Sequence, residues 1–356
     1  MRSLTLWFKR YFSDPEVVFL TVLLLVFFAI VLSMGDMLAP VLASLVIAYL
    51  LEGLVGMLEH KRVPRLAAVL VVYLCFLLFV TLLLLVVMPQ LSRQLTQLFQ
   101  QIPAMITEGQ NLLMQLPQHY PEFISQHEVQ EIIGVIRQEI AEFGQTVLSL
   151  SFSSVIGVIT ALVYLILMPL LVFFFLKDKE LLLGYLLGFF PRDRRLADTV
   201  WLDMDRQIAN YVRGKFWEIV IVWGVTSFVF SLMGLEYAVL LGMLVGLSVI
   251  IPYIGAAVVT FPVILIAWFQ WGWGSDFIWL TVAYFIIQIL DGNVLVPLLF
   301  SEAVNLHPVA IIVAILVFGG LWGFWGVFFA IPLATLVQAI IRAWPTVEAL
   351  EAKLNR

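Results

Sequence analysis

The feature that most constrains the fold of this chain is a long apolar stretch without any Lys or Arg, from Phe216 to Ile341. Gly and Pro interrupt the stretch repeatedly, and it contains five acidic residues, which are Glu218, Glu236, Asp276, Asp291 and Glu302. Hydrocarbon cannot satisfy free backbone groups, so such breaks persist only where they are buried in protein or line a wet cavity. The pattern is typical of a solute pathway through a membrane rather than of a purely structural helical bundle.

The overall composition also indicates a membrane protein. Of the 356 residues, 63% are hydrophobic and 12% are charged, whereas soluble domains are roughly 45–50% apolar and about 25% charged. The net charge is −5 and the basic residues are confined to a few loops, which argues against a nucleic-acid partner. Cys75 is the only cysteine, so one chain cannot form a disulfide or a cysteine-rich metal site. No cofactor or metal is expected.

The hydrophobic pattern predicts an all-α polytopic membrane protein with about eight transmembrane helices, because each crossing needs about 20 apolar residues. Three crossings are expected in residues 1–88 and a fourth in residues 155–176; the first three are Val17–Met34, Met37–Leu58 and Leu66–Met88, with a short loop at Gly35-Asp36. Four more are expected in residues 216–341, namely Phe216–Gly234, Tyr237–Trp271, Phe277–Phe300 and His307–Ile341.

Two of the C-terminal segments, Tyr237–Trp271 and His307–Ile341, are too long for one straight helix and are interrupted near their middles. They are predicted as broken or re-entrant helices, which leaves a count of ten crossings open. The interruptions give a set of expected helix breaks and hinges: Pro252, Gly255, Pro262, Pro297, Gly319, Gly320, Gly326 and Pro332. Gly255 and Gly319 are expected to permit a close backbone approach or a positive φ.

The two long segments share a faint similarity. Ile254-Gly255 followed by Phe261-Pro262 resembles Trp325-Gly326 followed by Ile331-Pro332, if a one-residue gap is allowed. Paired broken segments at matching places are a sequence indication of a transport site near the middle of the bilayer. Chance similarity between apolar sequences is the alternative explanation.

The distribution of basic residues predicts the orientation in a bacterial inner membrane. Lys and Arg are frequent near the N-terminus, at Lys61-Arg62 and in residues 177–215, whereas residues 89–154 contain only Arg93 and Arg137. By the positive-inside rule, both termini, residues 177–215 and the tail 342–356 face the cytoplasm, and residues 89–154 face outward. The first span lacks a clean cleavage site and is expected to be retained.

Residues 89–154 are too polar to span a membrane but have helical periodicity. One stripe contains Leu91, Leu95, Leu98 and Ile102, and a second runs from Val129 to Val147. These amphipathic helices are expected to pack on each other, on the membrane surface or on a neighbouring protomer of a homo-oligomer; a solute-capturing cap is the alternative. Residues 177–215 form another basic amphipathic segment, which is expected to contact membrane lipids.

The polar residues of the C-terminal half predict a transport pathway. Its candidate residues are Gln288, Asp291, Asn293, Glu302, Asn305 and His307. Carboxylates and amides in an apolar environment suit a hard cation or a proton relay, and a solvated turn at Asp291–Asn293 is the alternative. Arg213, Lys215 and Glu218 mark the cytoplasmic border, where Glu218 is expected to pair with Lys215 or Arg213. His307, which precedes Pro308, is predicted as a hydrogen-bonded turn residue rather than a metal ligand.

The order of these motifs resembles the autoinducer-2 exporter family of permease-type bacterial inner-membrane proteins. The resemblance covers nearly the whole chain and rests on Tyr211-Val212-Arg213-Gly214-Lys215, Ile251-Pro252-Tyr253-Ile254-Gly255, the segment Gln288–Pro297, Leu306-His307-Pro308, and Gly319 to Pro332. Family members commonly have Glu before the amide, where this chain has Asp291 followed by Gly292. A role assigned to that glutamate is therefore not automatically retained.

The resemblance implies a secondary transporter that moves a small solute, with a signalling molecule as one candidate, coupled to an ion gradient or down the solute's own gradient. A sodium–proton antiporter, with a monovalent cation or proton as its partner, is the alternative within transport. A non-transporting scaffold that recruits partners through its outward helices is the alternative from another class. The sequence contains no metalloprotease, serine-hydrolase or Walker motif, so an enzyme is not expected.

Overall fold

The computed structural model describes residues 15–114, 155–188, 195–252, 254–300 and 306–343, together with scattered positions between 130 and 142. Throughout these residues the secondary structure is helical and no strand is present. Six helices of the described part are long and apolar enough to cross a membrane: Met37–His60, Arg65–Asn111, Gln207–Leu232, Ile254–Trp271, Ser275–Phe300 and Pro308–Phe328. Shorter apolar helices accompany them. The predicted all-α polytopic fold is confirmed.

Three N-terminal helices form one packed group: α2 (Pro15–His60), α3 (Arg65–Leu82) and α7 (Val155–Lys177). Their shared core is aliphatic and consists of Ala48, Leu51, Val55, Ala68, Val69, Val72, Val172 and Leu176. At one end, the Glu52 carboxylate accepts hydrogen bonds from Lys179 at 2.9 Å and Arg65 at 3.4 Å. Lys179 begins α8 (Lys179–Gly188), so these ion pairs connect α2, α3 and α8.

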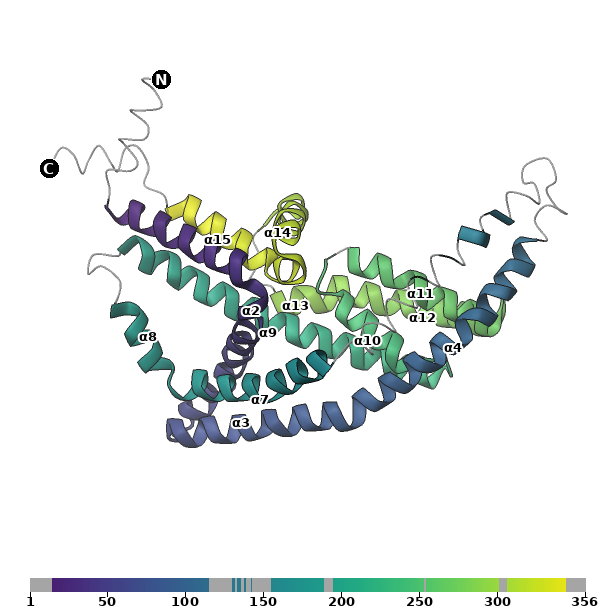
Figure 1. Ribbon diagram of the computed structural model, residues 1–356, viewed down its shortest axis with the longest axis horizontal. Coiled ribbons are helices and arrows are strands. Elements are labelled where there is room, and N and C mark those ends of the chain that lie inside the picture. The colour runs from purple at the N-terminus through teal and green to yellow at the C-terminus, as the bar shows by residue number, and fades with distance from the viewer. Residues whose placement is uncertain are drawn as a thin grey trace, which may run out of the picture.

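The predicted loop at Gly35-Asp36 is wrong. Both residues lie inside α2, a single helix of 46 residues, which is about 69 Å long at 1.5 Å per residue. Continuing the helix satisfies the backbone groups of these two residues internally. Pro40 lies within the helix, and Figure 1 shows that α2 changes direction along its length.

The amphipathic segment of residues 89–154 begins as a continuation of the helix that precedes it. A π-helix, η1 (Leu83–Val87), joins α3 to α4 (Met88–Leu113), and Figure 1 shows the two helices as one long curved arm. Along the first predicted stripe, Leu91 is buried and Leu98 packs against the C-terminal core, whereas Leu95 is exposed. This stripe therefore packs on the same chain. Most of the second stripe, from Val129 to Val147, lies outside the described residues.

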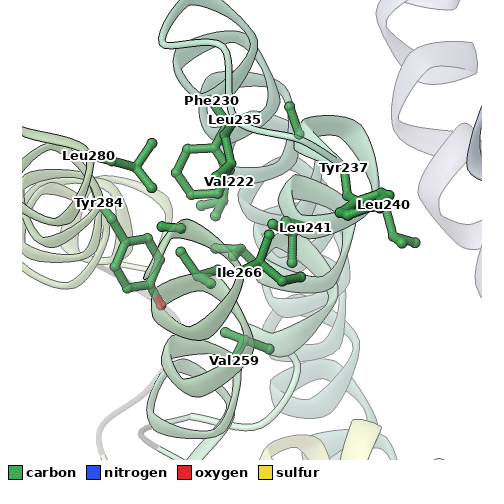
Figure 2. Close-up of a cluster of buried hydrophobic side chains, with 14 of the residues drawn as sticks. Val222, Phe230, Leu235, Tyr237, Leu240, Leu241, Val259, Ile266, Leu280 and Tyr284 are labelled. Atoms are coloured by element: carbon green, nitrogen blue, oxygen red, sulfur yellow. The ribbon is translucent and has the colours of Figure 1, made fainter. Parts of the chain in front are cut away.

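The C-terminal core is built around α9 (Arg195–Leu232), which joins the predicted basic amphipathic segment to the predicted span without a break. On it pack α10 (Ala238–Ser248) and α12 (Ser275–Leu290), and α11 (Ile254–Trp271) packs on both of these helices. Figure 2 shows the interior of this group, where Phe230, Leu241, Leu280 and Tyr284 are fully buried. Apolar burial of this kind holds the helices around the site described below.

The remaining elements complete the C-terminal half. After α12 come the π-helix η2 (Asp291–Leu295), α13 (Val296–Phe300), α14 (Pro308–Phe328) and α15 (Ala330–Ala343). The two segments predicted to be broken are broken: α10 ends at Ser248 and α11 begins at Ile254, and α14 bends sharply at Gly323 before α15. With 11 residues, α10 is about 16 Å long, roughly half of the hydrocarbon thickness.

Candidate functional site

Two helix hairpins contain the same close contact between a glycine and a backbone carbonyl group. The first hairpin consists of α10 and α11 with the break between Ser248 and Ile254. In the second hairpin, the first arm is α14 up to the bend at Gly323, and the second arm is the rest of α14 together with α15. A Cβ atom on Gly255 would overlap the carbonyl oxygen of Ser248, and one on Gly326 would overlap that of Phe318. In both hairpins, therefore, a glycine of the second arm allows the backbone of the first arm to approach directly.

The spacing of the two hairpins supports the predicted similarity. Pro262 is the fourteenth residue after Ser248 in the first hairpin, and Pro332 is the fourteenth residue after Phe318 in the second. The contact glycine is the seventh residue after the carbonyl in the first and the eighth in the second, which accounts for the one-residue gap between the two sequences.

The other predicted hinge glycines have different surroundings. A Cβ atom on Gly319 would lie 2.8 Å from the Val327 side chain. The missing side chain of Gly319 therefore makes room for another side chain and not for a backbone group. Gly320 faces open space. The positive φ of the second hairpin belongs instead to Gly323, at 57°, a conformation that glycine adopts readily.

The predicted prolines occupy distinct positions. Pro252 lies in the first break, Pro262 lies within α11, and Pro297 is exposed in α13. Pro332 is buried in the first turn of α15, where a missing backbone N–H costs little.

One face of α9 binds both hairpins, at the break of the first and beside the start of α15 in the second. The Tyr211 hydroxyl donates a hydrogen bond to the Phe328 carbonyl oxygen at 3.1 Å, beside the start of α15. The Lys215 ammonium donates to the Val249 carbonyl oxygen at 2.9 Å, at the end of α10. Residues four apart on a helix point the same way, so the spacing of Tyr211 and Lys215 places both donors on one face.

The short helix α13 packs between these two donors. A Cβ atom on Gly214 would lie 2.8 Å from the Phe300 ring and 3.2 Å from the Leu299 carbonyl oxygen, so only glycine permits this approach. The Phe300 ring centroid lies 6.0 Å from the Tyr211 ring and 5.2 Å from the Lys215 nitrogen. In this motif, Tyr211 and Lys215 are thus the two hydrogen-bond donors, and Gly214 leaves the space in which α13 packs.

Lys215 and Glu218 form a buried ion pair. Their Nζ and Oε2 atoms are 2.6 Å apart, and their side chains are only 5% and 3% exposed. The predicted partnership of Glu218 with Lys215 is confirmed, and the pair lies inside the protein rather than at a solvated border. Arg213 is exposed: it packs over Gly53 of α2 and donates to the Ala209 carbonyl oxygen of its own helix.

Asp291 begins η2 immediately after α12. Its Oδ1 atom is buried and has no hydrogen-bond partner in the described part of the chain. The η2 segment contacts α9, and the charges of Lys215 and Glu218 both interact with the Asp291 carboxylate. One cation and two carboxylates therefore share this region, at a π-helical turn of the kind frequently found at functional sites.

A separate group of polar side chains connects α12 to α11, beginning one turn before Asp291. Gln288 donates to the Tyr284 hydroxyl at 2.9 Å, and the Tyr284 and Thr260 hydroxyls are 2.9 Å apart. Thr260 also donates to the Ala256 carbonyl oxygen of α11 at 2.7 Å. Sequence reasoning identified Gln288 as a site residue but missed Tyr284 and Thr260, and it named Tyr211 only as part of a family motif. The four-residue spacings from Tyr211 to Lys215 and from Tyr284 to Gln288 are the signal that could have found the two tyrosines.

The remaining predicted pathway residues do not join this cluster. The exposed Asn293 donates from Nδ2 to the Ile289 carbonyl oxygen at 2.9 Å, within its own helix. His307 is exposed and caps α14, because its Nδ1 accepts a hydrogen bond from the Val309 amide at 3.2 Å. Glu302 and Asn305 lie outside the described residues. Within the described ranges, no group of three or more His, Cys, Asp or Glu residues could hold a metal ion.

Comparisons with known proteins identify the family of this chain. The sequence model of the AI-2E family transporters matches residues 19–346. The chain is 45% identical over 345 residues to the permease PerM of Escherichia coli (strain K12), covering 97% of this chain and 98% of that protein. It is 29% identical over 305 residues to the transport protein YrrI of Bacillus subtilis (strain 168), covering 85% of each chain. The chain therefore belongs to the AI-2E transporter family, whose members are multi-pass membrane transporters.

Proposed function

We propose that this chain is a secondary transporter of the bacterial inner membrane that exports a small polar solute past Lys215, Glu218 and Asp291. The observation that carries the proposal is the position of this buried charged cluster, where α9 meets the first hairpin and η2. Transport is driven by an ion gradient or by the gradient of the solute itself. The names of the relatives support a permease and give no support to the antiporter alternative.

The charge of the cluster suggests the kind of solute. Lys215 is paired with Glu218, so the Asp291 carboxylate supplies the surplus negative charge. A lipid-exposed carboxylate at the bilayer centre costs about 2.5–3.5 kcal/mol on insertion scales, so this group is expected to face water or a bound partner during transport. Its free Oδ1 atom fits a solute that offers a hydroxyl, an amine or another hydrogen-bond donor.

Purified protein in liposomes provides the test. Flux of hydroxylated and amine-containing solutes is measured under imposed proton, sodium and solute gradients. We expect Asp291→Asn to lower the flux by about tenfold or more, a loss of about 1.4 kcal/mol of transition-state stabilisation. Asp291→Glu should retain part of the flux. The matched control is Asp276→Asn, which changes an exposed carboxylate in the first turn of α12. Wild-type flux in Asp291→Asn would contradict the proposed pathway.

The proposed orientation places both termini and residues 177–215 in the cytoplasm. Single cysteines introduced by Arg194→Cys and Gln110→Cys in a Cys75→Ala background test it in intact cells. A reagent that does not cross membranes should label position 110 and leave position 194 unlabelled. The reverse pattern would invert the orientation.

We also propose that the chain forms a homo-oligomer surrounded by membrane lipids. Apolar side chains of α3 and α14, including Leu74, Leu78, Leu316 and Leu321, are exposed in the single chain, and lipids or a second copy would cover them. Mass measurement in mild detergent and in nanodiscs tests this assembly. A monomer in both media would contradict it.

A further inference from the structure

The Lys215 ammonium group occupies a well-defined site of its own. It donates hydrogen bonds to the Glu218 carboxylate at 2.6 Å and to the Val249 carbonyl oxygen at 2.9 Å. The face of the Phe300 ring lies 5.2 Å away, and aromatic faces attract cations electrostatically. The surrounding atoms thus match the three donors and the single charge of a primary ammonium ion.

This ammonium group also balances the charge of the site. The ionisable groups that interact there are Lys215 and Glu218 on α9 and Asp291 on η2. The break of the first hairpin contributes a carbonyl oxygen and α13 contributes an aromatic ring. Without Lys215, the described part of the chain would leave two interacting carboxylates in a largely buried region without a compensating cation.

The two hydrogen bonds of Lys215 differ in what they connect. Glu218 lies three residues away on the same helix, so an intact α9 keeps the two side chains within reach of each other. Val249 follows the last residue of α10, so that bond joins α9 to the break of the first hairpin. Any movement of the break away from α9 must release the ammonium group from Val249, whereas Glu218 stays within its reach.

We propose that Lys215 is a positioning residue of the transport site. Its ammonium group holds the break of the first hairpin on α9 and compensates Glu218 and Asp291, so that movement of the hairpin and the charge balance of the site change together. The effect on transport rests on the proposed function, whereas the ammonium site is independent of it.

The ammonium site is tested by replacing the side chain with a free ion. Lys215→Ala removes three carbon atoms and the nitrogen, which together correspond to propylammonium. Thermal unfolding of the full-length variant in nanodiscs is followed with propylammonium chloride, propan-1-ol or sodium chloride. We expect a lowered Tm that propylammonium raises toward the wild-type value, since a ligand that binds only the folded state stabilises it. Propanol and sodium chloride should have no such effect.

Lys177→Ala is the matched control. Lys177 also lies near a carboxylate, Asp178 at 3.8 Å, and over an aromatic ring, Phe174 at 5.9 Å, but its side chain is 43% exposed. Its removal should leave the Tm unchanged, and propylammonium should add nothing. Equal stabilisation of both alanine variants by propylammonium, or stabilisation of Lys215→Ala by propanol, would overturn the ammonium site.

A double variant separates positioning from folding. Lys215→Met with Glu218→Gln keeps the side-chain volumes and removes the buried ion pair, so it should fold even if Lys215→Ala does not, and propylammonium should not affect its Tm. Its flux should fall about tenfold or more, because Asp291 loses its cation, whereas Lys215→Arg should retain partial flux. Wild-type flux in the neutral double variant would overturn the positioning role. Absence of flux in the wild-type protein would contradict the proposed function, and thermal rescue would still decide the ammonium site.

Discussion

The two hairpins of the C-terminal half use the same glycine-to-carbonyl contact in opposite environments. In the first hairpin, α10 is buried on several sides and packs along α9, where Gly242 and Gly246 meet Ser227 and Trp223 at distances that exclude a Cβ atom. In the second, α14 has three buried residues among those described, Ala314, Ile315 and Gly326, and exposes most of its length. The shared glycine-to-carbonyl contact therefore does not require a shared environment.

The attachment to α9 differs in the same way. The first hairpin is bound by the charged, buried Lys215 and the second by the neutral hydroxyl of Tyr211. The second hairpin is also held at its base, because α15 packs on α9. Because α10 is largely buried and α14 is not, the first hairpin is expected to be held more firmly than the second. Within the second hairpin, α14 is expected to move more easily than α15.

The largest expected effect comes from filling the glycine contacts. Gly255→Val and Gly326→Val each place side-chain atoms on a backbone carbonyl group that cannot move independently. Each variant should lose transport, with flux reduced by about 100-fold, or about 2.7 kcal/mol, while membrane insertion is preserved. Flux in liposomes and the yield of folded protein by gel filtration are the measurements.

Gly320→Val is the control for these variants, because Gly320 has open space around it and should tolerate the side chain. Gly242→Val should instead lower the yield of folded protein, since it disrupts the packing of α10 on α9. Equal loss of folded protein at Gly255, Gly326 and Gly242 would assign all three glycines to packing alone.

A smaller effect is expected from removing the neutral attachment. Tyr211→Phe deletes one hydrogen bond to the Phe328 carbonyl oxygen, which is worth about 0.5–1.5 kcal/mol, and keeps the ring contact with Phe300. Flux should fall about three- to tenfold, less than for the neutral double variant at Lys215 and Glu218. A Tyr211→Phe variant that loses more flux than the double variant would reverse the ranking of the two attachments.

The difference in mobility is open to direct measurement. Amide hydrogen exchange in detergent should be faster in α14 than in α10, since poorly buried helices open at lower free energy than core helices. Peptides from residues 308–322 and 238–248 are compared by mass spectrometry. Equal protection from amide exchange in the two peptides would contradict the expected difference in mobility between α14 and α10.

The smallest effect concerns the outer contact of the first hairpin. The Gln94 side-chain oxygen of α4 accepts a hydrogen bond from the Leu240 amide at 2.8 Å. Gln94→Leu should lower the Tm by a few degrees, consistent with the loss of about 1 kcal/mol, and change flux less than twofold. Gln270→Leu is a useful comparison, because Gln270 binds both Gly234 and Glu236 in the turn before α10 and should cost more.

The sequence predicted the features that depend on local chemistry. Breaks between Ser248 and Ile254 and near Gly326 followed from Gly and Pro in apolar stretches, and the Lys215–Glu218 pair followed from opposite charges three residues apart. The continuity of α2 through Gly35-Asp36 was missed, because a polar dipeptide between apolar segments also marks a loop.

The tertiary partners could not be predicted. The Tyr211 hydroxyl bonds to a carbonyl group 117 residues away, and Lys215 to one 34 residues away. Such partners depend on helix packing, which periodicity does not specify. Asn293 lies close to Asp291 in the sequence, yet the helix continues as η2 and the Asn293 side chain donates to the Ile289 carbonyl oxygen of the preceding turn.

The continuous helix from α3 to α4 has a mechanical consequence. Gln94 lies 29 residues beyond Arg65, which is about 44 Å along the helix at 1.5 Å per residue. Tilting this helix by about 5° in the bilayer would shift Gln94 by about 4 Å, more than the length of its hydrogen bond to Leu240. Helices adjust their tilt to bilayer thickness, so a change of bilayer thickness is expected to act on the contact between Gln94 and α10.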